Sequence, residues 1–274
     1  MSDRYAVIGH PIAHSRSPAI HAAFARQTGQ DIEYGRLLAP LDGFKAAVAR
    51  FQAEGGNGLN VTLPFKLEAW QLADHLSERA RAAGVANTLR FEGPRIAADN
   101  TDGIGLVTDM QGRLGQTIDG ASVLLLGAGG AAQGVILPLL QAGVAHIEVV
   151  NRTADRAQRL ASLFEAQAGG RIHAAGLPVT SGRFDLLINA TSAGLDQTQQ
   201  LPVAPAVLAG ARLAIDMVYA ARPTAFMRAA REAGCAQVSD GLGMLVEQAA
   251  ESFFLWRGVA PATSEVLAAL RRHL

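Results

Sequence analysis

A glycine-rich turn stands at residues 127–132, directly after an apolar run. The stretch SVLLLGAGGAAQGV places Gly127, Gly129 and Ala132 in a G-x-G-x-x-A arrangement between a predicted strand and a predicted helix. Gly127 permits a tight turn, Gly129 lets a pyrophosphate approach the backbone, and Ala132 keeps strand and helix close. The helix N-terminus adds free N–H groups that attract anions. A glycine-rich packing turn is the alternative, so the motif alone does not decide between binding and packing.

Two arginines follow the next predicted strand, at the place where an NAD site carries an acid. That strand ends at Asn151, and Arg152, Thr153 and Arg156 follow. An acid there accepts a hydrogen bond from the adenosine ribose, whereas arginines bind a 2′-phosphate through charge-assisted hydrogen bonds. The pattern therefore predicts NADP. Thr153 as a helix N-cap, with Arg156 on a solvated face, is the structural alternative, and both can hold because caps and anions use the same N–H groups.

A second group of polar residues lies in the first part of the chain. They occur in the stretches GHPIAHSRSPAIH, GLNVTLPFK, ANTL and DNTDG, which follow or begin predicted elements. Because ligands of open α/β sheets gather beyond the carboxyl ends of strands, these loops are expected to form one substrate pocket. Singly, each residue has an ordinary interpretation as a helix cap, a turn residue or a solvated side chain. The group consists of Ser15, Ser17, Asn60, Thr62, Lys66, Asn87 and Asp102.

Alternating apolar runs and helical patterns predict the elements that hold these residues. This alternation indicates βαβ units and largely parallel sheets. In the first part we expect strands at 4–9, 32–38, 57–63 and 86–91 and helices at 17–28, 41–53 and 64–82. In the second part we expect strands at 121–126, 146–151, 171–174, 185–190, 212–218 and 236–239 and helices at 130–142, 153–165 and 224–233. A helix at 102–115 is expected to join the two series.

A further helix with an apolar stripe is predicted after the sequence SDGLGM. Such a stripe requires a surface to cover. Its residues are Leu245, Val246, Ala249, Ala250, Phe253 and Phe254.

The composition argues against several classes of protein. With 24 Lys and Arg against 24 Asp and Glu, the 274-residue chain has no global charge that favours nucleic acid or an anionic membrane as partner. A hydrophobic fraction of 49% is typical of a globular α/β enzyme. Cys235 is the only cysteine, which excludes an intrachain disulfide and indicates a reducing compartment, the cytoplasm. No stretch predicts a signal peptide or a transmembrane span.

The motifs together resemble the shikimate dehydrogenase family, whose members use NADP to reduce 3-dehydroshikimate to shikimate in aromatic amino-acid biosynthesis. PIAHSRSPAIH, NVTLPFK, NTDG, GAGGAAQGV, NRT, INATSAG and DGLGMLVEQAA stand in the family's order along nearly the whole chain. The pair NVT-x-PFK and NTDG is the most specific. Ala86, where Val is common, and Arg16, where Lys is common, depart from the pattern without touching a predicted role.

The resemblance implies an α/β fold of two domains with a cleft between them. A mostly parallel α/β substrate domain would comprise residues 1–101 plus 242–274, and a Rossmann-type NADP domain residues 102–241. Substrate would be held by Ser15, Ser17, Thr62, Lys66, Asn87, Asp102, Tyr219 and Gln248. NADP would be held by Glu78, Gly127, Ala128, Gly129, Gly130, Ala131, Asn151, Arg152, Thr153, Arg156, Met217 and Gly241. The expected partners are these small molecules, with the protein a monomer or a homodimer.

Lys66 and Asp102 are the predicted catalytic pair. Hydride added to a ring ketone leaves negative charge on oxygen, so a proton donor must lie within hydrogen-bond reach, and Lys66 is the predicted donor. Asp102 would orient the new hydroxyl and hold the lysine. A neighbouring carboxylate favours the ammonium form and desolvation favours the amine, and the sequence does not decide between them.

Other interpretations stay open beside this one. His10, His14 and His21 suggest a metal site, but Pro11 interrupts them and partner cysteines are missing, so no metal is expected. The stretch ATSAG at 190–194 approaches a nucleophile elbow, yet the sequence after it is a poor helix former. A quinate/shikimate or aminoshikimate-type dehydrogenase is the nearest enzymatic alternative. A non-catalytic nucleotide-binding relative is the alternative from another class.

Overall fold

The computed structural model describes residues 2–191 and 202–274, and the chain divides into two compact units. The first unit comprises Met1–Gly105 with Val246–His273, and the second comprises Leu106–Leu245 with Leu274. The divisions after Gly105 and after Leu245 fall within helices, α5 (Asp102–Thr108) and α11 (Leu242–Arg257). No helix among the described residues is long and apolar enough to cross a membrane. The end of the INATSAG motif, residues 192–194, lies outside the described residues.

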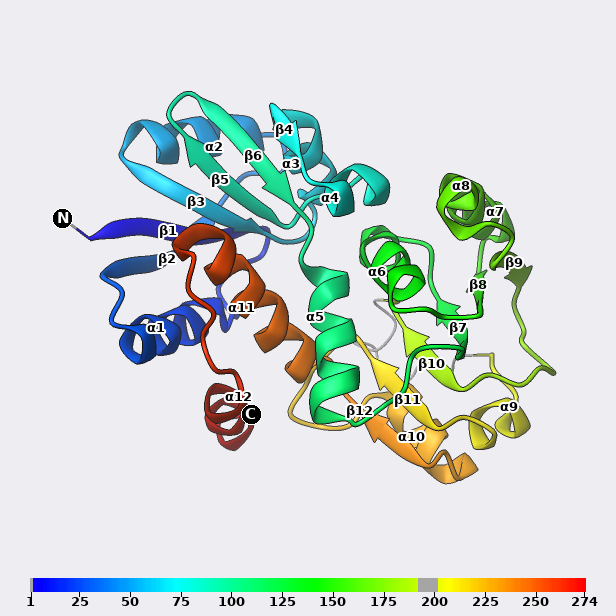
Figure 1. The fold of residues 1–274 in the computed structure, drawn as a ribbon. Coiled ribbons are helices and arrows are strands. Elements are labelled where there is room, and N and C mark those ends of the chain that lie inside the picture. The colour runs from blue at the N-terminus through cyan, green and yellow to red at the C-terminus, as the bar shows by residue number, and fades with distance from the viewer. Residues whose placement is uncertain (1, 192–201) are drawn as a thin grey trace. The chain divides into compact units, whose positions relative to one another are not determined.

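The first unit contains a six-stranded mixed sheet with the order β2-β1-β3-β5-β6-β4 (Figure 1). β1 runs parallel to β2 and β3, and β4 runs parallel to β6, whereas β5 is antiparallel to β3 and β6. The strands are β1 (Asp3–Gly9), β2 (Ile32–Leu38), β3 (Gly56–Val61), β4 (His75–Leu76), β5 (Thr88–Glu92) and β6 (Arg95–Asp99). The helices besides α5 and α11 are α1 (Ser17–Thr28), α2 (Phe44–Ala53), α3 (Lys66–Leu72), α4 (Glu78–Ala83) and α12 (Ser264–Arg272).

Side chains of β1 point alternately to the two faces of this sheet, and both faces are covered by helices. Ala6 and Ile8 belong to a core cluster that also contains residues of α2. Tyr5 points to the other face, where its ring stacks on Trp256 of α11 with centroids 4.6 Å apart. This face of the sheet therefore provides the surface that the apolar stripe of α11 covers.

The stripe differs from the prediction at one position. Val246, Ala249, Ala250 and Phe253 are buried, but Phe254 is 45% exposed. Ser252 is instead fully buried, in a position that apolar periodicity assigns to no stripe. The prediction for Phe254 was wrong because the buried face of α11 extends to the side of Ser252, which is polar, and not to the side of Phe254.

Two other predicted elements also differ from the structure. The helix expected at 64–82 is interrupted, because β4 pairs with β6 and separates α3 from α4. Strand β6 itself was not predicted, nor was helix α9 (Pro205–Ala209) of the second unit. The joining helix expected at 102–115 is α5 followed by a π-helical turn, η1 (Asp109–Arg113). These are short segments whose structure depends on partners distant in sequence.

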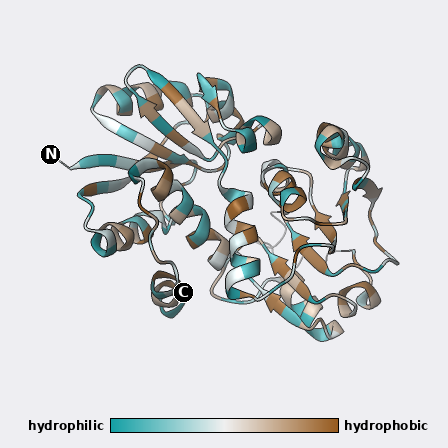
Figure 2. Cartoon of the chain, in the orientation of Figure 1, coloured by the Kyte–Doolittle hydropathy of each residue, from teal (hydrophilic) through white to brown (hydrophobic). Residues whose placement is uncertain are grey.

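The second unit contains a six-stranded sheet in which all pairs are parallel, in the order β12-β11-β10-β7-β8-β9. Counted from β7, the order is 6-5-4-1-2-3, the doubly wound arrangement of dinucleotide-binding domains. Its strands are largely hydrophobic, as Figure 2 shows, which fits a sheet covered on both faces. The strands are β7 (Ser122–Leu126), β8 (His146–Asn151), β9 (Ile172–Gly176), β10 (Leu186–Asn189), β11 (Leu213–Asp216) and β12 (Gln237–Ser239). The helices besides α9 are α6 (Gly130–Gln141), α7 (Ala154–Leu163), α8 (Glu165–Ala168) and α10 (Ala225–Ala233).

Candidate active site

Lys66 and Asp102 form an ion pair in the first unit. Each is the first residue of a short helix, α3 and α5 respectively, and the Lys66 Nζ atom lies 2.5 Å from Asp102 Oδ2. Their side chains are 18% and 8% exposed, so the pair is mostly but not fully removed from solvent. An ammonium in this position retains room to approach a ligand while its geometry is fixed by the carboxylate.

Asn87 holds the second oxygen of the Asp102 carboxylate. Its side-chain Oδ1 accepts the backbone N–H of Thr101 at 2.9 Å, and a backbone N–H can only donate. The amide is thereby oriented so that Nδ2 faces Asp102 Oδ1 at 2.9 Å and Gln248 Oε1 at 3.1 Å. Both carboxylate oxygens of Asp102 thus have a fixed donor, one charged and one neutral.

A buried network of hydroxyl and amide groups supports Asn87. The Ser252 hydroxyl donates to the carbonyl of Gln248 and lies 2.8 Å from the hydroxyl of Thr88. Asn60 donates to Ser252 at 2.9 Å and accepts from the Tyr34 hydroxyl at 2.7 Å. The sequence did not single out Thr88 or Ser252, since only Asn87 was selected from the stretch ANTL and Ser252 belongs to none of the quoted motifs.

Ser15 and Ser17 lie together at the start of α1. The Ser15 hydroxyl is 3.2 Å from that of Ser17, and it accepts the Ser17 backbone N–H at 3.3 Å. The N-cap residue of α1 is Arg16, whose own side chain forms no capping hydrogen bond. Thr62 follows β3, and its methyl group would lie 2.5 Å from a Cβ atom at Gly9, so the two loops pass in close contact.

The glycine-rich turn of the second unit has the geometry that a phosphate needs. Gly127 has φ of +109°, which a side chain would strain. Gly129 is extended and exposed, with no heavy atom within 4 Å of its hypothetical Cβ, and α6 begins at the next residue, Gly130. The backbone is therefore open to a ligand at a helix N-terminus, and the residues present fit a dinucleotide pyrophosphate. Ala128 and Ala131 complete the turn and are partly buried.

The side chains of the two arginines after β8 are exposed, and their guanidinium groups make no hydrogen bond or ion pair within the described residues. Asn151 ends β8, and its amide donates to the carbonyl of Thr153 at 3.0 Å. Thr153 is the N-cap residue of α7, as expected, but its side chain forms no capping hydrogen bond. Arg152 and Arg156 therefore keep their hydrogen-bonding capacity for a ligand.

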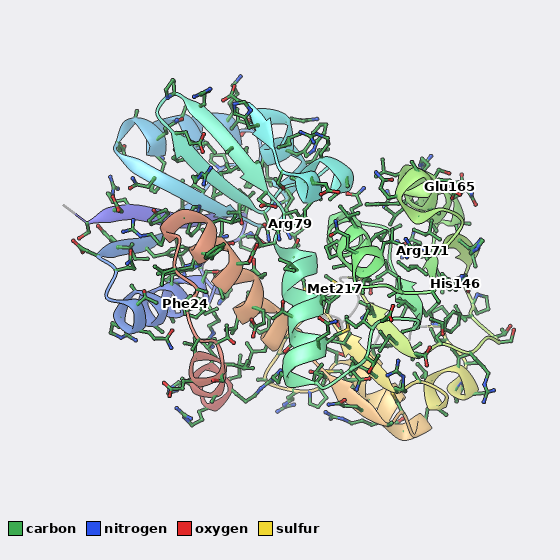
Figure 3. All side chains as sticks on the ribbon, in the orientation of Figure 1. Phe24, Arg79, His146, Glu165, Arg171 and Met217 are labelled. Atoms are coloured by element: carbon green, nitrogen blue, oxygen red, sulfur yellow. The ribbon has the colours of Figure 1, made fainter. Side chains whose placement is uncertain are left out.

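The remaining predicted contacts are divided between the units. Met217, labelled in Figure 3, directly follows β11, and its carbonyl would lie 2.2 Å from a Cβ atom at Gly241. Tyr219, which the family resemblance assigns to substrate, is half-buried in the second unit. Glu78, which the family resemblance assigns to NADP, is exposed at the start of α4 in the first unit.

Histidines do not assemble a metal site in the described part of the chain, where no group of three or more potential His, Cys, Asp or Glu ligands occurs. His21 is fully buried among aromatic rings and stacks on Tyr34 with centroids 4.1 Å apart. Burial lowers the pKa of His21 to about 3, and neither ring nitrogen has a hydrogen-bond partner among the described residues. His10 instead contacts the carbonyl of Ala39 at 2.8 Å.

The all-parallel sheet, the open glycine turn and the ammonium–carboxylate pair define a dinucleotide-dependent oxidoreductase. Models of three domains match the chain: the shikimate dehydrogenase substrate-binding domain over residues 7–89, shikimate/quinate 5-dehydrogenase over 110–218, and the shikimate 5'-dehydrogenase C-terminal domain over 241–271. The chain belongs to the shikimate dehydrogenase family.

Two relatives named as shikimate dehydrogenases and one structural neighbour with another name are similar to the chain. The shikimate dehydrogenase (NADP(+)) of Aromatoleum aromaticum is 56% identical, with 99% of this chain and 98% of that protein covered. The Thermus thermophilus shikimate 5-dehydrogenase, solved with NADP(H) and shikimate, is 35% identical, covers 99% of this chain and 100% of its own, and superimposes with a TM-score of 0.86. The 5-ketofructose reductase of a Gluconobacter strain is 29% identical, covers 100% and 99%, and has a TM-score of 0.89.

Proposed function

We propose that this protein catalyses the reversible NADPH-dependent reduction of 3-dehydroshikimate to shikimate. The observation that carries the proposal is the Lys66–Asp102 pair, held at 2.5 Å and clamped by Asn87. The fit of the turn at 127–131 to a dinucleotide supports it, as do the names of the family and of the relative that is 56% identical.

Lys66 is proposed as the proton donor and Asp102 as the residue that orients it. NADPH, when bound, supplies the hydride to the substrate ketone. The Lys66 ammonium then gives a proton to the ketone oxygen as negative charge develops there, and in the reverse direction the amine removes that proton. Asp102 Oδ2 contacts Lys66 and Oδ1 contacts Asn87. Because the carboxylate is itself held, it fixes the position from which the ammonium can reach the ketone oxygen.

The residues proposed to hold substrate supply the donors and acceptors that a carboxylate and several hydroxyl groups require. The paired Ser15 and Ser17 hydroxyls at the α1 N-terminus suit the substrate carboxylate. Asn87, Asp102 and Gln248 form one hydrogen-bonded cluster that suits the ring hydroxyls. The full proposed set is Ser15, Ser17, Thr62, Lys66, Asn87, Asp102, Tyr219 and Gln248.

The residues proposed to hold NADP combine backbone N–H groups with two free guanidinium groups. Arg152 and Arg156 would bind the 2′-phosphate, and the turn at the α6 N-terminus would bind the pyrophosphate. The full proposed set is Glu78, Gly127, Ala128, Gly129, Gly130, Ala131, Asn151, Arg152, Thr153, Arg156, Met217 and Gly241.

We further propose that residues 1–101 plus 242–274 act as the substrate domain and residues 102–241 as the NADP domain, in a monomer or homodimer. The single cysteine, which is partly buried, supports a reducing compartment such as the cytoplasm.

One assay tests the proposed function directly. Purified protein mixed with NADPH and 3-dehydroshikimate should consume NADPH, measured by its absorbance, and shikimate should appear as product. Absence of turnover with this pair would refute the proposal and favour the non-catalytic alternative. Faster turnover with quinate and NAD would favour a quinate/shikimate enzyme, and 5-ketofructose serves as a control substrate because a neighbour of similar fold reduces it.

A further inference from the structure

A fully buried carboxylate, that of Asp216, lies at the end of β11 in the second unit and has no role in the proposed mechanism. Its Oδ2 accepts the Asn189 amide at 3.0 Å and the Thr224 hydroxyl at 2.7 Å. Its Oδ1 accepts the backbone N–H of Val218 at 3.0 Å. Burial raises the pKa of Asp216, while these three hydrogen bonds oppose the rise. The carboxylate therefore gathers donors from β10, from the segment after β11 and from the N-terminus of α10.

Asn189 extends this cluster toward the glycine-rich turn. Its Oδ1 accepts the backbone N–H of Thr191 at 3.1 Å and the Thr191 hydroxyl at 2.7 Å. Because a backbone N–H only donates, the amide orientation is fixed and Nδ2 must face Asp216. The Thr191 methyl group would lie 3.1 Å from a Cβ atom at Gly127. Asp216 is thus linked through two residues to the start of the turn.

The same cluster fixes the backbone around Met217. The Met217 N–H donates to the Asn189 carbonyl at 2.9 Å, and the Gly241 N–H donates to the carbonyl of Val218 at 3.2 Å. The Met217 carbonyl lies so close to Gly241 that a Cβ atom there would be 2.2 Å away. Met217 is consequently held from both sides, with little freedom to shift.

The position of this segment in the sheet indicates which end of the cofactor it faces. A doubly wound sheet consists of two mononucleotide-binding halves, and a dinucleotide binds across the point where the strand order reverses. Here that point lies between β7 and β10. The glycine turn and the arginines follow β7 and β8, the half assigned to adenosine. The segment after β11 belongs to the other mononucleotide-binding half. Because adenosine occupies the first half, we infer that this segment faces the nicotinamide.

We propose that Asp216 is a positioning residue that holds Met217 and Val218 in place for the nicotinamide end of the cofactor. The inference rests on the proposed NADP-dependent function. Asp216 touches neither cofactor nor substrate in this account, and it acts through the backbone of the two residues that follow it. The alternative is that Asp216 only stabilises the second unit.

Asp216→Asn is the informative substitution because it preserves shape and removes the charge. In either orientation of the new amide, its N–H₂ group meets another donor, either the Asn189 amide or the Val218 N–H. We expect the NADPH dissociation constant to rise about tenfold, the order of magnitude for a lost hydrogen bond to a charged group. Binding of 2′,5′-ADP, which contains only the adenosine half with its phosphates, should stay within about twofold by the same scale. Both are measured by calorimetry.

Two further variants separate positioning from folding. The double variant Asn189→Asp with Asp216→Asn restores a donor facing an acceptor across this pair, since the Thr224 hydroxyl can also accept, and should recover most of the NADPH affinity. Thr224→Val removes the hydrogen bond to Asp216, and also the N-cap bond that Thr224 Oγ1 accepts from the Met227 N–H at 3.3 Å, at nearly unchanged size. It should produce a smaller selective loss of NADPH affinity than Asp216→Asn, even if Asp216→Asn fails to fold. Asp109→Asn is the matched control, because Asp109 is also buried in the second unit and pairs with Arg113.

The outcomes are distinct. Selective loss of NADPH over 2′,5′-ADP, reversed in the double variant, supports the proposal, whereas equal loss of both ligands, or no loss, overturns it. Asp109→Asn should lower thermal stability without changing the ratio of the two affinities. These binding measurements need no substrate, so wild-type protein that binds NADPH but fails to reduce 3-dehydroshikimate would refute the proposed function while leaving this inference testable.

Discussion

The two regions proposed to act on substrate and on cofactor both contain basic side chains, but these side chains differ in whether the protein itself supplies a partner. Lys66 and Asp102 are paired, mostly buried and supported by Asn87. Arg152 and Arg156 are exposed, and neither guanidinium group has a partner among the described residues. The first arrangement fixes a geometry before any ligand arrives, whereas the second leaves its partner to be supplied by the ligand.

The difference follows from the work each region has to do. Proton transfer requires a donor placed within a few tenths of an ångström, so the lysine is held by a carboxylate that is itself held. Binding of a dianionic phosphate gains most when the guanidinium groups have no internal partner to displace. Surface ion pairs contribute little to stability, so leaving the arginines unpaired costs the fold little.

Removing the ammonium should produce the largest effect. For Lys66→Ala we expect kcat to fall by about 10²- to 10⁴-fold, the usual contribution of a positioned acid or base, with little change in KM. NADPH consumption under saturating substrate measures this. Lys45→Ala, on exposed surface of α2, is the matched control. Near-normal turnover of Lys66→Ala would show that the buried pair is structural, and the contrast between the two regions would then disappear.

Removing both arginines tests whether the unpaired guanidinium groups bind the 2′-phosphate. Arg152→Ala with Arg156→Ala should weaken NADPH by roughly 10- to 100-fold, because charge-assisted hydrogen bonds to the 2′-phosphate are lost. Affinity for NADH should change far less, since it lacks that phosphate. Arg159→Ala, also exposed on α7, is the control and should leave the preference for NADPH intact. Equal losses for the two cofactors would mean that the arginines serve the fold rather than the phosphate.

A smaller effect, on the pH dependence of stability, is expected from His21, which is buried among aromatic rings in the first unit. The pKa of His21 is lowered to about 3 in the folded state, against an ordinary value near 6.5. As pH falls below about 6.5, the unfolded chain takes up a proton that the folded chain does not, so stability decreases until pH approaches the folded pKa. Between pH 6.5 and 5 this amounts to about 2 kcal/mol.

His21→Phe should remove that part of the pH dependence. Urea unfolding of wild type and variant at pH 7 and pH 5 measures it, with His75→Gln as an exposed control. An unchanged difference in stability between the two pH values in His21→Phe would mean that His21 does not carry it. Such a result would also argue against a neutral, fully buried His21 in the folded first unit.

Local patterns were enough to predict several features of this protein. The glycine spacing at 127–132, the apolar strands around it and the arginines after β8 are short-range features, and each lies within one βαβ unit where propensity and periodicity act directly. The strands of the second unit were therefore placed to within two residues at each end. Strand β6 and the break between α3 and α4 were missed because the break is strand β4, which forms by pairing with β6. Such pairing between separate segments leaves no local pattern in the sequence.

What the sequence by itself determined is the set of chemical groups and the class of fold. Only the tertiary structure decided how those groups are oriented, because orientation depends on partners far along the chain. Lys66 meets Asp102 across 36 positions, and Asn60 meets Ser252 across 192. Nothing local in the sequence marks Ser252 or Asp216, since a lone polar residue in an apolar element becomes informative only when the fold surrounds it with donors.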